Sequence, residues 1–253
     1  MGPFPRRFLV FAMNDHHDGE TPVPILAPDR ARALDRHLVE ALGIPGIILM
    51  EHAALGIAAL VRRVAATHGR DRAVVLCGTG NNGGDGWAVA RLLHEDHEVL
   101  VVSTGTPRTD SDAAVNAEAT RRLGIEIVDM DSDDLERRLS GAVVVDALFG
   151  IGLDRPIGGR VADLVEMVDR SDAIVIAVDL PSGMDASTGR PTGPCIRADA
   201  TATMAALKPG LVAEGADSLT GPVTIVDIGA PRRILERFAD VARSPATGDD
   251  ADS

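Results

Sequence analysis

The stretch Cys77–Leu93 reads CGTGNNGGDGWAVARLL and joins two patterns of different period. The apolar run Ala73–Leu76 before it predicts a buried strand, and the residues from Trp87 onward have helical spacing. Between them we expect a glycine-rich loop at a helix N-terminus, where unpaired backbone N–H groups and partial positive charge favour phosphate. Its glycines would allow close approach of a ligand and positive φ angles; they are Gly78, Gly80, Gly83, Gly84 and Gly86.

The segment GTGNNG also matches the dinucleotide-binding pattern G-x-G-x-x-G, which is weak on its own. A dehydrogenase of that type carries an acidic residue about 20 positions further on, at the end of the second strand. The predicted second strand, Glu98–Val102, is followed by Ser103, Thr104 and Gly105, with no carboxylate. An NAD-dependent oxidoreductase is therefore a disfavoured alternative, and the polar run NNGGDG is the more specific feature.

Apolar strands alternate with helical segments along most of the chain, which predicts a parallel sheet covered on both faces. We therefore expect an α/β fold, a Rossmann-like three-layer αβα sandwich with a mostly parallel central sheet. The expected strands are Ala73–Cys77, Glu98–Val102, Ile125–Val128, Ala142–Asp146, Ala173–Val178, Thr201–Ala205 and Val223–Ile228. The expected helices are Asp29–Leu42, Pro45–Val64, Trp87–His94, Asp112–Leu123, Asp133–Leu139 and Val161–Val168.

Two aspartates, Asp146 and Asp179, each end an apolar strand. The carboxyl ends of parallel strands share one edge of the sheet, so both side chains are candidates for a ligand crevice there. The alternative for each is a carboxylate that caps a turn. Lys208 is the only lysine, so 24 of the 25 basic residues are arginine. A single lysine in a chain that otherwise uses arginine indicates a position that arginine cannot fill. The alternative is that the lysine occurs there by chance.

The net charge of −13 disfavours nucleic acid and anionic membrane surfaces as partners. No apolar run reaches 18 residues, so no membrane span is expected, and we expect a cytoplasmic protein. Aspartate outnumbers glutamate 27 to 11, and with the near absence of lysine this indicates a high-salt cytoplasm. A halophilic archaeon is the source this predicts, with ordinary codon bias as the alternative.

We expect three segments along the chain. Residues 1–26 have no periodicity and predict a loose N-terminal arm, within which Met13 is the expected start. Residues 27–240 form one domain, and the small, acidic residues 241–253 predict a disordered tail.

Three motifs together are far more specific than any one of them. They are Gly78–Arg91 (GTGNNGGDGWAVAR), Val144–Ile157 (VVDALFGIGLDRPI) and Val178–Gly189 (VDLPSGMDASTG). In this order they resemble the motifs of the NAD(P)H-hydrate epimerases, the YjeF-type N-terminal domains. Weaker similarity in the flanking segments extends the resemblance to residues 27–238.

The resemblance implies an isomerase of metabolite repair that interconverts the R and S forms of NADHX or NADPHX at nicotinamide C6. It implies Asp179 as the catalytic acid/base, which also contacts substrate, and one K⁺ per subunit on Asn82, Asp146 and Ser182. The other implied substrate contacts are Asn81, Asn82, Gly83, Gly84, Asp85, Gly150, Ile151, Gly152, Leu153, Asp154, Arg155 and Pro156.

Arg155 is the expected phosphate partner in its loop. The resemblance also implies a separate S-specific dehydratase as functional partner, and a homodimer. The alternative is a non-catalytic scaffold of the same fold that binds a nucleotide or dimerises.

Overall fold

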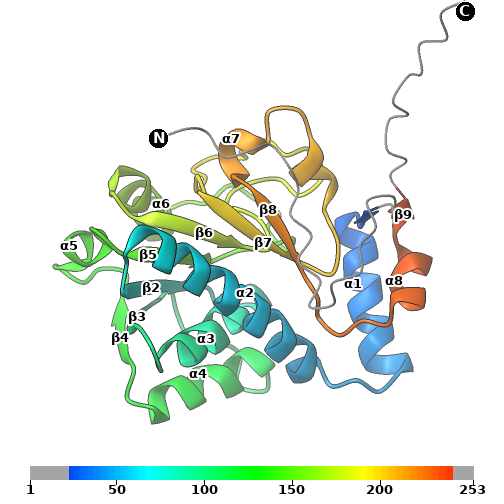
Figure 1. Cartoon of the computed structure of the whole chain (residues 1–253), viewed down its shortest axis with the longest axis horizontal. Coiled ribbons are helices and arrows are strands. Elements are labelled where there is room, and N and C mark those ends of the chain that lie inside the picture. Colours follow the sequence, from blue (N-terminus) through cyan, green and yellow to red (C-terminus); the bar gives the residue numbers. More distant parts are fainter. Residues whose placement is uncertain (1–22, 242–253) are drawn as a thin grey trace, which may run out of the picture.

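The computed structural model describes residues 23–241, and its centre is a seven-stranded sheet in which every pair of neighbours is parallel (Figure 1). All seven expected strands are present, with ends shifted by at most a few residues. In sheet order they are β4 (Glu126–Asp129), β3 (Glu98–Ser103), β2 (Arg72–Cys77), β5 (Val143–Ala147), β6 (Ile174–Val178), β7 (Ala200–Met204) and β8 (Val223–Val226).

Helices cover both faces of the sheet, which confirms the three-layer αβα architecture. One face carries α2 (Gly46–His68), α3 (Asn81–Leu93) and α4 (Asp112–Arg122), and the other carries α5 (Leu135–Leu139) and α6 (Arg160–Arg170) (Figure 1). Successive strand residues enter opposite cores: Val75 packs with the first group of helices and Val74 with the second. Strands buried on both faces explain the continuous valine-rich runs in the sequence.

The helix α3 begins at Asn81, six residues earlier than expected, so most of the glycine-rich segment is helical rather than loop. None of its glycines has a positive φ, which corrects the expectation of left-handed backbone there. Four of them are needed for close packing, whereas a Cβ on Gly80 would meet nothing within 4 Å. A Cβ on Gly83 would collide with the carbonyl oxygen of Gly78, and one on Gly86 would lie 2.6 Å from the Cβ of Ala147.

Both ends of the described chain meet beside the sheet. The strand β1 (Pro24–Ile25) pairs antiparallel with β9 (Asp240–Val241), and α1 (Pro28–Arg36) packs against α8 (Arg232–Phe238) (Figure 1). A π-helical turn, η1 (His37–Ala41), continues α1.

The expected boundary of the N-terminal arm at residue 26 is wrong. Pro24 and Ile25 pair in a sheet, and Leu26 is 1% exposed. Val241, expected in the tail, also lies in a strand. The rest of the predicted arm and tail lies outside the described residues. Two short helices, η2 (Pro209–Val212) and α7 (Asp217–Thr220), connect β7 to β8. Among residues 23–241, no helix combines the length and apolar character needed to cross a lipid bilayer.

Candidate active site

A pocket of about 510 Å³ opens at the carboxyl ends of β2, β5, β6 and β7. The sheet order reverses direction between β2 and β5, and ligands of open α/β sheets bind at such a switch point. Polar residues that follow β2, β6 and β7, together with two from α1, line the pocket. They are Arg32, Asp35, Thr79, Asn81, Asn82, Asp85, Asp179 and Lys208.

Asp179 lines this pocket and is 4% exposed. Its Oδ1 accepts the hydroxyl of Thr203 at 3.3 Å and forms an ion pair with the Nζ of Lys208. Its Oδ2 accepts the backbone N–H of Ile151 at 3.3 Å. The carboxylate is therefore held from β7 on one side and from the loop after β5 on the other.

The backbone at Asp179 is unusual. Its φ is 69°, and the N–H of Leu180 donates to the carbonyl of Val178 at 2.9 Å, which makes a γ-turn centred on Asp179. The same turn ends the neighbouring strand β7, where Ala205 has φ 61° and Ala206 donates to Met204. These two are the non-glycine residues with positive φ in the described part of the chain. Strained backbone of this kind clusters at functional sites.

Asn82, in the first turn of α3, presents a side-chain amide with no partner. Its Oδ1 and Nδ2 are both buried and make no hydrogen bond within the described structure. A Cβ placed on Gly150 would lie 3.0 Å from Asn82 Oδ1 and 2.9 Å from Asp179 Oδ2, so both oxygens face the same glycine. A buried amide without partners is costly unless a ligand satisfies it.

Asp146, at the end of β5, is fully buried and pairs with Ser182 below the loop that follows. The N–H and the hydroxyl of Ser182 donate to the carboxylate at 2.8 and 2.6 Å, and the N–H of Leu148 donates at 3.3 Å. Burial raises the pKa of Asp146 to about 6, although the hydrogen bonds from Ser182 lower it. The Ser182 hydroxyl also accepts the N–H of Phe149 at 2.9 Å, which ties the pair to the pocket wall.

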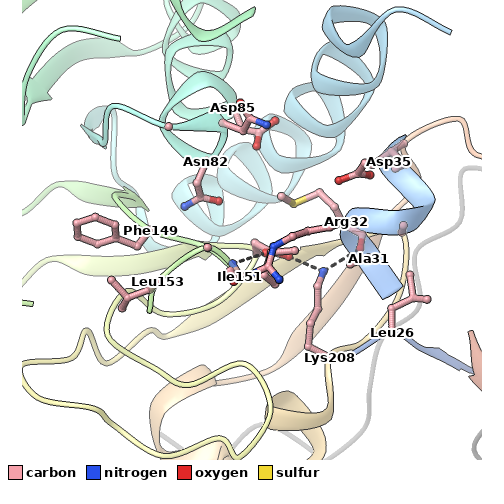
Figure 2. Close-up of a pocket in the computed structure, with 18 of the residues that line it drawn as sticks. Leu26, Ala31, Arg32, Asp35, Asn82, Asp85, Phe149, Ile151, Leu153 and Lys208 are labelled. Atoms are coloured by element: carbon pink, nitrogen blue, oxygen red, sulfur yellow. Dashed lines mark hydrogen bonds and ion pairs between the residues drawn. The ribbon is translucent and has the colours of Figure 1, made fainter. Parts of the chain in front are cut away.

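Two further carboxylates share the pocket with Asp179 (Figure 2). Asp85 projects from α3 and is 6% exposed; burial, and then the charges of Asp179 and Asp35, raise its pKa well above its ordinary value. Asp35 lies on α1 at the opposite wall. Beside it, the guanidinium of Arg32 donates to the carbonyl of Ile151 at 2.8 Å and spans from α1 to the loop after β5.

The structure brings together some of the expected site residues and separates others. Asn81, Asn82, Asp85, Asp179 and the loop residues 150–153 line the pocket. Gly83 and Gly84 are buried within α3, and residues 154–156, with Arg155 exposed, lie outside the lining.

Sequence patterns did not predict Arg32 or Asp35 at the pocket and gave no role to Lys208. The isolation of Lys208 among arginines was a usable signal. An amphipathic helix such as α1 offered none, because its polar residues look like an ordinary solvent-facing side.

The profile of the family described as "YjeF-related protein N-terminus" matches residues 46–210, which is more than half of the chain. The chain belongs to this family. NAD(P)H-hydrate epimerase of Rhodopirellula baltica is 38% identical over 220 residues, which cover 86% of this chain and 89% of that protein. NAD(P)H-hydrate epimerase of Limosilactobacillus reuteri (strain DSM 20016) is 34% identical over 204 residues, which cover 80% and 94% of the two chains.

Other members of the YjeF-related family are longer. The bifunctional NAD(P)H-hydrate repair enzyme Nnr of Salinibacter ruber is 38% identical over 232 residues, and the match covers 43% of its length. The crystal structure of yeast ynu0 (YNL200c) superposes with a TM-score of 0.74 at 21% identity, covering 89% of this chain and 97% of that one. This structural likeness supports the fold. The helix α1, with Arg32 and Asp35, lies outside the segment that the family profile matches.

Proposed function

We propose that this protein is an NAD(P)H-hydrate epimerase that interconverts the R and S forms of NADHX or NADPHX. The observation that carries the proposal is the buried carboxylate of Asp179 in a pocket at the sheet's switch point. The names of the relatives that align over most of the chain supply the substrate class.

Epimerisation at nicotinamide C6 requires a proton to be taken up and returned, whether the ring opens or water leaves and adds again. A partly desolvated carboxylate at a fixed position suits this task. Asp179 is such a group, because contacts on both of its oxygens hold it in one orientation. We assign it the acid/base role.

The substrate would lie between α3 and the loop after β5. Asn81, Asn82 and Asp85 face it from α3, and the loop residues 150–153 face it from β5. Backbone N–H groups at the start of α3 are suited to the pyrophosphate. Arg32 supplies a cation in the pocket lining beside Ile151, which makes it a better phosphate partner than Arg155, which lies outside the lining.

We also assign one K⁺ ion per subunit to Asn82, Asp146 and Ser182. K⁺ prefers several oxygen ligands of low charge. The unpartnered Oδ1 of Asn82, the carboxylate of Asp146 and the hydroxyl of Ser182 offer such a set. Bound there, the ion would neutralise a buried charge and stabilise the loops around Asp179. Within residues 23–241, no group of three or more His, Cys, Asp or Glu side chains could hold a metal ion.

Three further assignments complete the proposal. A separate S-specific dehydratase would consume the S form, a role consistent with the bifunctional names of some relatives. The enzyme would act as a homodimer. It would work in a high-salt cytoplasm, the setting that its acidic, lysine-poor composition favours.

The test is a coupled assay with R-enriched NADHX and an excess of S-specific dehydratase in about 1 M KCl, a concentration at which salt strongly screens surface charges. We expect this protein to accelerate recovery of NADH absorbance. We expect Asp179→Asn to reduce the rate at least about hundredfold.

The matched control is Asp185→Asn, on the same connection between β6 and β7 but outside the pocket lining. Asp185 Oδ1 accepts N–H groups of Ser187 and Thr188, which an asparagine oxygen can also accept. This variant should keep the wild-type rate. Folded wild-type protein that gives no acceleration would favour the non-catalytic scaffold instead.

A further inference from the structure

Lys208 is the sole lysine of the chain, and its side chain is only 3% exposed. A buried ammonium is costly unless its charge and all three of its N–H donors are satisfied. Here Nζ pairs with the carboxylate of Asp179, donates to the hydroxyl of Thr203 at 2.8 Å and donates to the carbonyl of Met204 at 3.0 Å. The three donors are therefore all used.

The backbone turns bring these two charges together. The γ-turn at Ala205 ends β7 three residues before Lys208, and the γ-turn at Asp179 ends the adjacent strand β6. A compact ammonium suits three acceptors that converge on one point. The planar fork of arginine would direct its donors apart, which explains why this chain keeps one lysine here.

The surrounding charges make a cation necessary at this point. Asp179 faces two other pocket carboxylates, Asp85 from α3 and Asp35 from α1, and both interact with it and with Lys208. Three acidic groups around a pocket repel one another and an anionic ligand. Lys208 offsets this repulsion from below the carboxylate of Asp179.

We propose that Lys208 is a positioning residue for the epimerase reaction, one that holds Oδ1 of Asp179 so that Oδ2 faces Ile151 and the substrate. The inference rests on the proposed function. Because Lys208 acts through Asp179, its removal should slow the chemical step and leave substrate binding nearly intact.

The kinetic test is a double-mutant cycle with Lys208→Met and Asp179→Asn. We expect Lys208→Met to lower kcat at least about hundredfold with KM changed less than about threefold. In the Asp179→Asn background, the same substitution should change kcat by less than about threefold, since the carboxylate it positions is gone. Equal losses in both backgrounds would overturn the inference.

The matched control is Thr201→Val, which removes a buried hydroxyl from the same strand, β7, outside the pocket lining. It should keep kcat. Wild-type protein without epimerase activity would defeat the proposed function, whereas an active wild type with an unimpaired Lys208→Met variant would defeat this inference alone.

A spectroscopic test does not depend on turnover or on the folding of Lys208→Met. In protein labelled with [¹⁵N]lysine, one side-chain NH₃⁺ signal can arise, because the chain has a single lysine. We expect the wild-type signal to be visible through slow hydrogen exchange, and Asp179→Asn to shift it or remove it by faster exchange. A signal unchanged by Asp179→Asn would overturn the pairing.

Discussion

At the scale of single residues, two strained turns shape the candidate site. Asp179 and Ala205 end adjacent strands with φ angles of 69° and 61°. An L-residue in the left-handed region costs roughly 1–2 kcal/mol relative to its ordinary conformations. The rest of the fold outweighs this cost, and in return the carboxylate of Asp179 and the ammonium of Lys208 meet across the ends of β6 and β7.

The strain predicts opposite effects for two substitutions of Ala205. Glycine relieves the left-handed strain but adds freedom to the unfolded chain, so Ala205→Gly should raise the free energy of unfolding by about 0–1 kcal/mol. A β-branched residue fits this region poorly, so Ala205→Val should lower it by at least about 2 kcal/mol. Urea denaturation measures both. Equal stability of the two variants would argue against the strained turn.

The buried carboxylate of Asp146 predicts a pH dependence. Its pKa rises from 3.8 unfolded to about 6 folded, so the folded state favours the protonated form. Without K⁺, the stability from this group is present below about pH 4 and is lost as pH rises through 6, an effect of about 3 kcal/mol. A bound cation prefers the ionised form, so it would restore stability above pH 6.

We therefore expect KCl to raise Tm over tetramethylammonium chloride at equal ionic strength, by more at pH 8 than at pH 5. In Asp146→Asn this difference between the salts should disappear. A K⁺ effect of the same size in Asp146→Asn would exclude Asp146 as a ligand.

At the scale of elements, helix α3 depends on glycines that let it approach the strands. An added Cβ at Gly83 would meet the backbone carbonyl of Gly78, which cannot move without disrupting the loop after β2. At Gly84 it would lie 2.6 Å from the terminal methyl of Met50, a flexible side chain, and 3.0 Å from the Cβ of Ala113. The same substitution thus meets a rigid obstacle at one position and a movable one at the next.

We expect Gly83→Ala to lower the free energy of unfolding by at least about 3 kcal/mol. Gly84→Ala should change it by less than about 1 kcal/mol, because the better helix propensity of alanine offsets the crowding around Met50. Chemical denaturation of the two variants checks this pair. A larger loss for Gly84→Ala would show that backbone proximity is not what selects glycine in α3.

The sequence was sufficient to predict the seven sheet strands and the covering helices, since buried parallel strands and amphipathic helices have distinct periods. It misplaced the start of α3 by six residues, because glycines required for close packing look the same as glycines required for a loop. The sequence also did not predict that α1 contributes residues to the pocket. Arg32 and Asp35 reach the pocket through long-range packing that no local pattern reveals.

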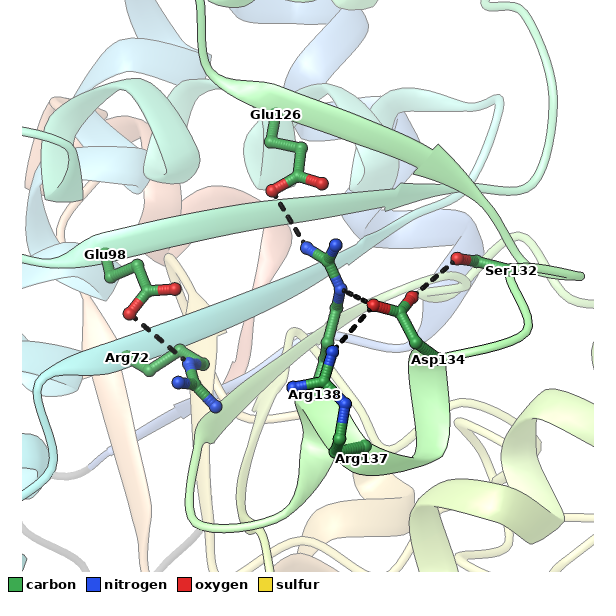
Figure 3. A network of polar contacts seen from close by, with 7 residues as sticks. All are labelled: Arg72, Glu98, Glu126, Ser132, Asp134, Arg137 and Arg138. Atoms are coloured by element: carbon green, nitrogen blue, oxygen red, sulfur yellow. Dashed lines mark hydrogen bonds and ion pairs between the residues drawn. The ribbon is translucent and has the colours of Figure 1, made fainter.

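At the scale of the whole molecule, a net charge of −13 opposes an anionic substrate. Many surface charges are paired, as where Arg138 on α5 joins Glu126 on β4 and Asp134 (Figure 3). Such exposed pairs are screened by salt and contribute little to stability there. The excess acidic charge remains, and among the described residues that line the pocket, Arg32 and Lys208 are the cations that counter it, together with local N–H groups.

This balance predicts how binding responds to salt. The KM for NADHX should fall as NaCl rises from about 0.1 M to about 1 M at constant K⁺, because salt shortens the range of electrostatic interactions and so weakens the repulsion between protein and substrate. Arg32→Gln should raise KM at both concentrations. A KM that rises steadily with salt would show that attraction by the local cations dominates over the net charge.

The proposed function is that this chain interconverts the two NADHX epimers through Asp179. It is tested most directly by incubating pure S-NADHX and R-enriched NADHX separately with the enzyme, without dehydratase, and following both epimers by chromatography. We expect both mixtures to reach the same R:S ratio, quickly with wild type and at the spontaneous rate with Asp179→Asn. If wild-type enzyme changes the R:S ratio no faster than the spontaneous reaction does, the proposed function is contradicted.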